Sequence, residues 1–179
     1  MDGELTAFIN RLSGTALVDA AMMLVSAYGV PLIVALVTLQ WFGRGNRAHI
    51  RHVAIVAGLA FLLGLALNQL VLLGIHRARP YDAGVTRLLI AKSADWSFPS
   101  DHATAAVAVA FAFLINGLRR RGLVLAGLAA LVCLSRVYLG IHYVGDILGG
   151  AATAGVAVLV VGRLYREGNR VDRLLVKIL

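Results

Sequence analysis

The sequence predicts an all-α protein, a polytopic membrane bundle of about five transmembrane helices preceded by an N-terminal amphipathic helix at the membrane surface. Of its 179 residues, 60% are hydrophobic, and the mean hydropathy is +0.83. This composition is well above the roughly half-apolar usage of soluble domains. Apolar stretches recur along the whole chain, with basic residues gathered between them. We therefore expect a single membrane-embedded domain over residues 1–179.

The N-terminal third supplies the surface helix and two spans. Residues 1–15 predict the amphipathic helix, because four apolar residues share one face: Leu5, Phe8, Ile9 and Leu12. The first apolar stretch, Ala20 to Phe42, is uncharged and long enough to span. Pro31 could divide it into an interfacial helix and a shorter span, so one helix and two helices both remain open. The second stretch, Val53 to Leu73, has 21 residues without a charge.

The other three spans have shorter apolar cores. These cores are Ala103 to Leu118, Leu123 to Leu134 and Ile147 to Val161. They reach spanning length only if the flanking polar residues continue the helices.

Eleven of the 17 basic residues lie on one side of this arrangement: Arg44, Arg47, Arg51, Arg119, Arg120, Arg121, Arg163, Arg166, Arg170, Arg173 and Lys177. By the positive-inside rule, that side is cytoplasmic. The N-terminus and the loop from His76 to Pro99 are then outside. Residues 163–179 form a basic cytoplasmic tail that we expect to touch anionic lipid, and no nucleic-acid partner is implied.

Every residue suited to chemistry falls at the outer ends of the spans. The four segments are "HRARPYD", "FPSDHAT", "SRVYLGIH" and "YVGDILGG". Ionisable residues at membrane depth are costly, so such a convergence indicates a functional site.

The residue types at these ends suit phosphate chemistry. Arg79 and Arg136 are permanent cations whose forked donors match phosphate oxygens. Ser100 opens a helix, where free N–H groups attract anions. His142 and Asp146 are four residues apart, so the carboxylate can orient the imidazole as a nucleophile. His102 can act as acid and base.

Structural roles remain open for several of these residues. Ser100, Asp101 and Asp146 could cap helices, and Arg136 could reach an interface. The sequence has no compact His/Cys cluster and no acidic pair typical of a metal site, so we expect no metal and no cofactor.

These residues resemble the motifs of the type 2 phosphatidic acid phosphatase superfamily. "SRVYLGIHYVGD" meets every fixed position of the third motif, from Ser135 to Asp146. "PSDH" matches the second motif except that Asp101 replaces glycine, which resembles the bacterial undecaprenyl-diphosphatase branch. The first motif keeps Arg79 and Pro80, but Leu72 occupies its lysine position.

The resemblance implies a role for each matched residue. His142 would attack phosphorus to form a phosphohistidine, Asp146 would orient it, and His102 would protonate the leaving oxygen. Arg79, Ser100 and Arg136 would hold the phosphate, without a metal. Further candidates for phosphate contact are Asp101 and Arg77, and the missing lysine could be replaced by Arg77, His76 or Lys92.

The resulting functional hypothesis is a lipid phosphatase at the outer face of a bacterial inner membrane, acting on undecaprenyl diphosphate and so recycling the lipid carrier of peptidoglycan synthesis. Phosphatidylglycerophosphate, phosphatidic acid and lipid A phosphate are alternative substrates, and transfer to another lipid is an alternative reaction. Vanadium haloperoxidases share the motifs but are soluble proteins. A lipid binder or transporter without chemistry is a different class that also remains open, as does the oligomeric state.

Overall fold

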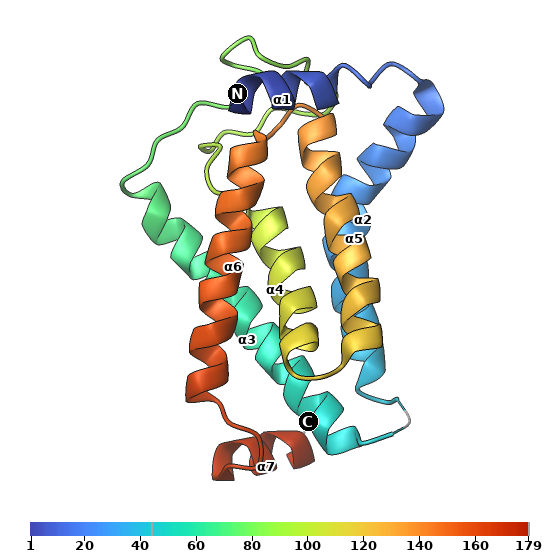
Figure 1. Ribbon diagram of the computed structural model, residues 1–179, viewed down its shortest axis with the longest axis vertical. Coiled ribbons are helices and arrows are strands. Elements are labelled where there is room, and N and C mark those ends of the chain that lie inside the picture. The colour runs from blue at the N-terminus through green and yellow to red at the C-terminus, as the bar shows by residue number, and fades with distance from the viewer. Residues whose placement is uncertain (44, 179) are drawn as a thin grey trace.

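The computed structural model describes residues 1–43 and 45–178, and the regular secondary structure of these residues is entirely helical (Figure 1). The helices follow in the order α1 (Asp2–Asn10), α2 (Ala16–Gln40), α3 (Arg47–Leu72), α4 (Asp101–Ile115), α5 (Arg119–Tyr138), α6 (Val144–Leu164) and α7 (Arg170–Ile178). Four of them, α2, α3, α5 and α6, are long and apolar enough to cross a membrane. The expected all-α membrane bundle is confirmed.

Helix α4 differs from the expected third span because it is too short. It has 15 residues, which at 1.5 Å per residue gives about 22 Å, and it ends where Gly117 takes a positive φ of 81°. It lies in the middle of the bundle against α3, α5 and α6 (Figure 1). Its buried residues are mostly alanines, which permit close helix packing. This enclosed position sets the N-terminus of α4 among the surrounding helices.

The other spans lie at their expected positions, and each helix is longer than the apolar stretch that predicted it. Residues 16–40 form one helix with Pro31 inside it, which settles the alternative of two helices. A Cβ on Gly29 would lie 2.5 Å from the Val132 side chain, so glycine there lets α2 approach α5 closely. Helices α5 and α6 continue beyond their apolar cores into the motif residues, as spanning length required.

Helix α1 lies across the ends of the other helices, beside the loop that joins α3 to α4 (Figure 1). Its polar residues Thr6 and Asn10 are buried, whereas Leu5, Phe8 and Leu12 are exposed. The Thr6 hydroxyl accepts a hydrogen bond from the backbone N–H of Val144. The apolar face is therefore turned away from the protein, as suits a helix lying in a membrane interface. The helix ends at Asn10, earlier than the expected residue 15.

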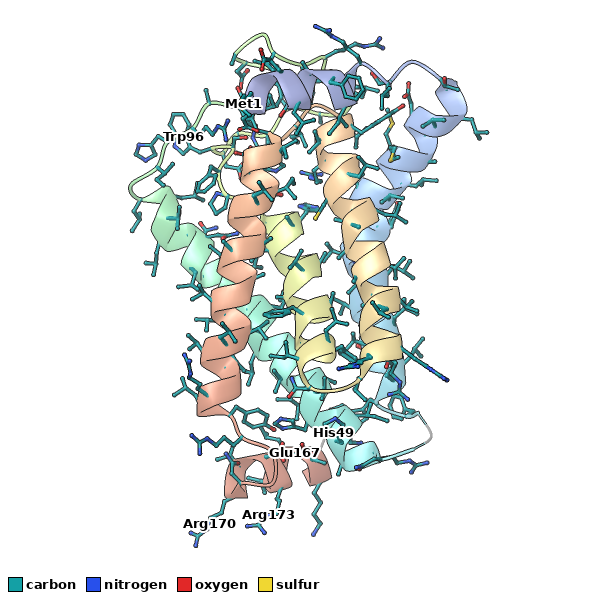
Figure 2. The ribbon with its side chains drawn as sticks, viewed as in Figure 1. Met1, His49, Trp96, Glu167, Arg170 and Arg173 are labelled. Atoms are coloured by element: carbon teal, nitrogen blue, oxygen red, sulfur yellow. The ribbon has the colours of Figure 1, made fainter. Side chains whose placement is uncertain are left out.

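The opposite end of the bundle carries α7, which is docked on α3. His52 Nδ1 lies 2.8 Å from Asp172 Oδ1, both side chains are buried, and the Tyr165 ring stacks on His52. Because α6 reaches Leu164, the expected tail of residues 163–179 begins later and is partly helical. Figure 2 shows Arg170 and Arg173 projecting away from the bundle at this end, opposite to Trp96.

The turn between α5 and α6 is fixed by α1 and the α3–α4 loop. Gly140 has a φ of +78°, a left-handed conformation that glycine adopts without strain. The Asn10 amide donates to the carbonyl oxygens of Tyr138 and Arg87, at 2.8 and 3.0 Å. Thr86 Oγ donates to the Gly140 carbonyl at 2.8 Å. Two segments that are distant in the sequence thus hold the turn that precedes His142.

We expect Gly140→Ala to destabilise the protein by about 1–3 kcal/mol, because a non-glycine residue is strained in this conformation. The added Cβ would also lie 2.4 Å from the Arg87 carbonyl oxygen. Thermal unfolding in detergent checks this, with Gly127→Ala in α5 as the control, since its Cβ meets no atom within 4 Å. Equal melting temperatures for the two variants would contradict the expectation.

Candidate active site

A cavity of about 120 Å³ lies at the end of the bundle nearest α1. Its lining comes from the ends of α3 and α5, the start of α4, the α3–α4 loop and the α5–α6 turn: Leu72, Arg79, Ser93, Asp95, Trp96, Pro99, Asp101, His102, Arg136 and His142. Five of the predicted site residues are therefore brought together here. Asp146, Ser100 and Arg77 are not among the lining residues. We call this cavity the outer pocket, after the side of the membrane on which the sequence analysis expects it.

His142 is held in one orientation inside the outer pocket. It follows α5 and is only 4% exposed. Its Nδ1 lies 2.8 Å from the carbonyl oxygen of Ser97 and 3.4 Å from Asp146 Oδ2. Since a carbonyl only accepts hydrogen bonds, we assign the proton to Nδ1. Nε2 then carries the free electron pair, 3.4 Å from Arg79 Nη1.

The surroundings of His142 favour its neutral form. Burial lowers the pKa of His142 most strongly, the hydrogen bond with Asp146 opposes this, and the charges of Arg136 and Arg79 lower it again. The net shift is downward from 6.5. A neutral imidazole has the electron pair that a nucleophile needs.

Asp146 connects His142 to the start of α6. The carboxylate is fully buried. It accepts hydrogen bonds from Ser97 Oγ, from the Tyr143 backbone N–H at 2.8 Å and from Arg77 Nη1 at 2.8 Å. It therefore positions Ser97, whose carbonyl oxygen contacts His142, besides capping α6. Sequence reasoning missed Ser97 because its contact to His142 uses a backbone carbonyl, which every residue type supplies.

Arg77 does not occupy the place that the sequence analysis considered for it. Its guanidinium donates to Asp146 and, at 2.6 Å, to Asp2 Oδ2 of α1. It also lies over the Tyr143 ring, 3.8 Å from the centroid. Because Arg77 is already paired with two carboxylates outside the pocket lining, the structure does not support a phosphate contact or replacement of the motif lysine.

Arg79 is buried and contacts a carboxylate in the outer pocket. Its Nη2 lies 2.7 Å from Asp95 Oδ1, and its Nη1 donates to the Ile141 carbonyl at 2.9 Å. Burial raises the pKa of Asp95, but hydrogen bonds from Ser93 and Arg79 outweigh this and lower it overall. Asp95 is thus an ionised partner of Arg79. It was missed because it lies in a loop outside the motifs.

Arg136 extends from α5 toward α2 and the pocket. Its Nη1 donates to Ser26 Oγ of α2 at 2.5 Å. Its buried Nε has no hydrogen-bond partner among the described residues. A ligand oxygen in the outer pocket can satisfy a donor of this kind.

The "PSDH" residues divide between structural and pocket positions. Ser100 is fully buried, and its Oγ accepts from the Ala103 N–H at 3.4 Å. It therefore caps α4, which is the structural role that the sequence analysis left open for it. Asp101 lines the pocket and accepts from Asn68 Nδ2 at 2.7 Å. His102 lines the pocket on the first turn of α4.

The position of the absent motif lysine faces the same pocket. Leu72 is a lining residue. Neither alternative cation lies there: the His76 ring packs beside Trp96, and Lys92, on the surface, lies 3.4 Å from Asp82. Among the described residues, Arg79 and Arg136 are therefore the only arginine or lysine side chains that line the outer pocket.

A helical membrane bundle with a fixed histidine and two buried arginines at one end has the features of a membrane-embedded lipid phosphatase. The family model of the PAP2 superfamily matches residues 52–170, and the chain belongs to this superfamily of lipid phosphatases. This confirms the resemblance found in the motifs.

Individual relatives agree with this assignment. Undecaprenyl-diphosphatase BcrC of Bacillus subtilis (strain 168) is 33% identical over 166 residues, covering 92% of this chain and 82% of the relative. A putative undecaprenyl-diphosphatase, YbjG of Escherichia coli (strain K12), is 32% identical over 130 residues, covering 73% and 63%. The crystal structure of a transmembrane PAP2-type phosphatidylglycerolphosphate phosphatase from Bacillus subtilis has the same fold, with a TM-score of 0.65, 23% identity and coverage of 93% and 87%. The chain is thus a bacterial-type membrane phosphatase.

Proposed function

We propose that this protein removes the terminal phosphate of undecaprenyl diphosphate at the extracytoplasmic face of a bacterial inner membrane. The observation that carries the proposal is His142 Nε2, buried beside Arg79 in the outer pocket with Nδ1 fixed by the Ser97 carbonyl. The names of the two relatives support the choice of lipid.

The distribution of charge supports the orientation. The α2–α3 loop, the α4–α5 loop and α7 lie together at the end of the bundle opposite to α1 (Figure 1). The eleven basic residues that the positive-inside rule places in the cytoplasm lie in these segments or next to them along the chain, at the starts of α3 and α5 and from the end of α6 onward. The outer pocket is at the other end, and the C-terminus is cytoplasmic in this orientation.

The first chemical step is attack on the terminal phosphorus. His142 Nε2 forms the new P–N bond while the bond from phosphorus to the bridging oxygen breaks. His102 gives a proton to that oxygen, and undecaprenyl phosphate leaves. Arg79 and Arg136 stabilise the charge on the transferring phosphoryl oxygens. To reach Arg79, the substrate phosphate replaces the Asp95 carboxylate.

The second step regenerates the histidine. His102 takes a proton from water, the water oxygen attacks phosphorus, and the P–N bond breaks to release inorganic phosphate. Acid–base help of this kind contributes about 10²- to 10⁴-fold to the rate. Both steps use groups of the chain itself, so phosphate release in EDTA is expected.

The test is phosphate release by the detergent-purified protein from undecaprenyl diphosphate, phosphatidylglycerophosphate and phosphatidic acid, in EDTA. Preferential release from the diphosphate supports the proposal. Preference for another lipid overturns the substrate, and loss of release in EDTA overturns metal independence. No release by folded protein overturns hydrolysis in favour of transfer to a lipid acceptor or of lipid binding alone.

We expect Leu72→Lys to lower the KM for the lipid diphosphate about tenfold with little change in kcat. The lysine would add a cation to the outer pocket, and a contact made equally in ground and transition states lowers KM alone. Steady-state kinetics check this, with Leu73→Lys as the control, because Leu73 is exposed and outside the lining. An unchanged KM in Leu72→Lys would contradict it.

The environment of His142 predicts a low titration midpoint in the ligand-free protein. Since burial lowers its pKa below 6.5, NMR of labelled histidine should show a midpoint below that value, for the signal that His142→Asn removes. The folded protein then binds this proton less readily than the unfolded chain, so His142 contributes a loss of stability as the pH falls below 6.5. A midpoint at or above 6.5 would contradict this.

A further inference from the structure

Two adjoining cavities lie at the start of α5, at the end of the bundle opposite the outer pocket. One, of about 350 Å³, is formed by the starts of α3 and α5 with the loops before them, and is lined by Arg119, Arg120 and Arg121. The other, of about 490 Å³, lies between α2 and α5 and is lined mainly by apolar side chains, including Leu36, Leu39, Val124 and Leu125. Arg120 and Arg121 belong to both, so the two cavities form one site with a basic end and an apolar end.

The basic end attracts anions for several independent reasons. No residue lining either cavity is acidic. Helix α5 has no side-chain cap and no acidic residue in its first turn, so its free N–H groups and dipole add to the arginine charges. Glu167, which does not line the cavity, adds one carboxylate 2.9 Å from the lining residue His49, and the three lining arginines outnumber it (Figure 2).

Two polar atoms of side chains that line the apolar cavity lack partners. Arg121 Nη1 and Gln40 Oε1 are buried and have no hydrogen bond among the described residues. Both side chains line the apolar cavity. A buried donor and a buried acceptor without partners are costly, and native proteins usually satisfy such groups with a ligand or water. A phosphate oxygen would satisfy the arginine, and a head-group hydroxyl would satisfy the glutamine.

We propose that this site binds an anionic phospholipid with a hydroxylated head group from the leaflet opposite the outer pocket. The phosphate lies on Arg120 and Arg121 at the start of α5, and an acyl chain runs along the apolar cavity between α2 and α5. Basic pockets between transmembrane helices on the cytoplasmic side suit such head groups. The site is separate from the chemistry of the outer pocket and does not depend on it.

Native mass spectrometry of the detergent-purified full chain tests the proposal, with phosphatidylglycerol and phosphatidylcholine added as probes. We expect retention of one phosphatidylglycerol in preference to phosphatidylcholine. Arg120→Gln/Arg121→Gln should weaken retention by about thirtyfold, as expected for two cations near a head group. The matched control is Arg163→Gln/Arg166→Gln, which removes the same charge at the end of α6. Equal loss in both double variants would overturn the site.

Removing two arginines could also change the membrane topology, so a second variant tests the site without changing any charge. Val124→Trp should fill the apolar cavity and weaken retention with all charges present, whereas Leu123→Trp, at an equally exposed residue outside both cavities, should not. Retention unaffected by Val124→Trp would overturn the acyl-chain position. Displacement of the lipid by millimolar inorganic phosphate, or equal retention of phosphatidylcholine, would overturn an anionic phospholipid as the ligand.

Discussion

His142→Asn is expected to lower phosphate release from undecaprenyl diphosphate about 10⁴-fold or more, the largest effect of any single substitution in the outer pocket. The variant loses Nε2, the atom proposed to form the bond to phosphorus. Its side-chain amide still offers a donor to the Ser97 carbonyl, which accepts from His142 Nδ1 at 2.8 Å. Asparagine therefore removes the nucleophile while preserving the contact that holds the turn, which His142→Ala would not.

Trapping the covalent intermediate provides a direct measurement. Substrate carrying a radiolabelled terminal phosphate is mixed with protein, quenched in base and separated from lipid, because a phosphohistidine survives base and decays in acid. Label should remain on the unaltered chain and on His49→Asn, which changes an imidazole at the opposite end. It should be absent from His142→Asn. Label that persists on His142→Asn, or activity within tenfold of the unaltered chain, would show that another group attacks phosphorus.

Asp146→Asn is expected to have the second largest effect, a loss of about 10³-fold in kcat with little change in KM. The carboxylate accepts from Ser97 Oγ, the Tyr143 N–H and Arg77. The asparagine amide has only one acceptor oxygen. Its NH₂ group would face donors that need an acceptor. Ser97 then loses the contact that positions its carbonyl against His142, while Arg79 and Arg136 still bind phosphate, so kcat is the parameter that falls.

The same substitution also lowers stability by about 1–3 kcal/mol, since buried donors lose their acceptor. Steady-state kinetics and thermal unfolding separate the two effects when read together with Asp2→Asn. That control removes the carboxylate oxygen to which Arg77 donates at 2.6 Å, keeps one oxygen for the Gly145 N–H, and should change kcat less than about threefold. If Asp146→Asn lost activity only in proportion to its unfolded fraction, Asp146 would have a structural role alone.

The features that depend on local pattern could be predicted from the sequence. The long uncharged stretch before Leu73 and the spacing of His142 and Asp146 are readable along the chain, and topology alone places His102, Arg79 and Arg136 at one end. In the structure the uncharged stretch is a long apolar helix, and His102, Arg79 and Arg136 line one cavity. His142, however, precedes α6 and does not share a helix with Asp146. The membrane explains this success, because it confines polar residues to the ends of apolar helices.

The features that depend on packing between distant segments could not be predicted. The enclosed position of α4 depends on its contacts with α3, α5 and α6, and the partners of Arg77 come from α1 and α6, 75 and 69 residues away. Asp95 lies in a loop with no periodic pattern, and Ser97 acts through its backbone. In each case the determining contact is long-range, and a single sequence carries no signal for it.

The contact between Asp95 and Arg79 has a consequence for product release. The Asp95 carboxylate is a counter-ion of Arg79 that belongs to the chain itself. An arriving anion must displace it, so the net binding free energy of the anion is its interaction with the guanidinium minus that of Asp95. Small monovalent anions gain little from this exchange, whereas a lipid diphosphate gains a second charge and its tail. In the proposed reaction, once hydrolysis has separated phosphate from the tail, Asp95 would compete with the inorganic phosphate for Arg79 and shorten the residence of this product.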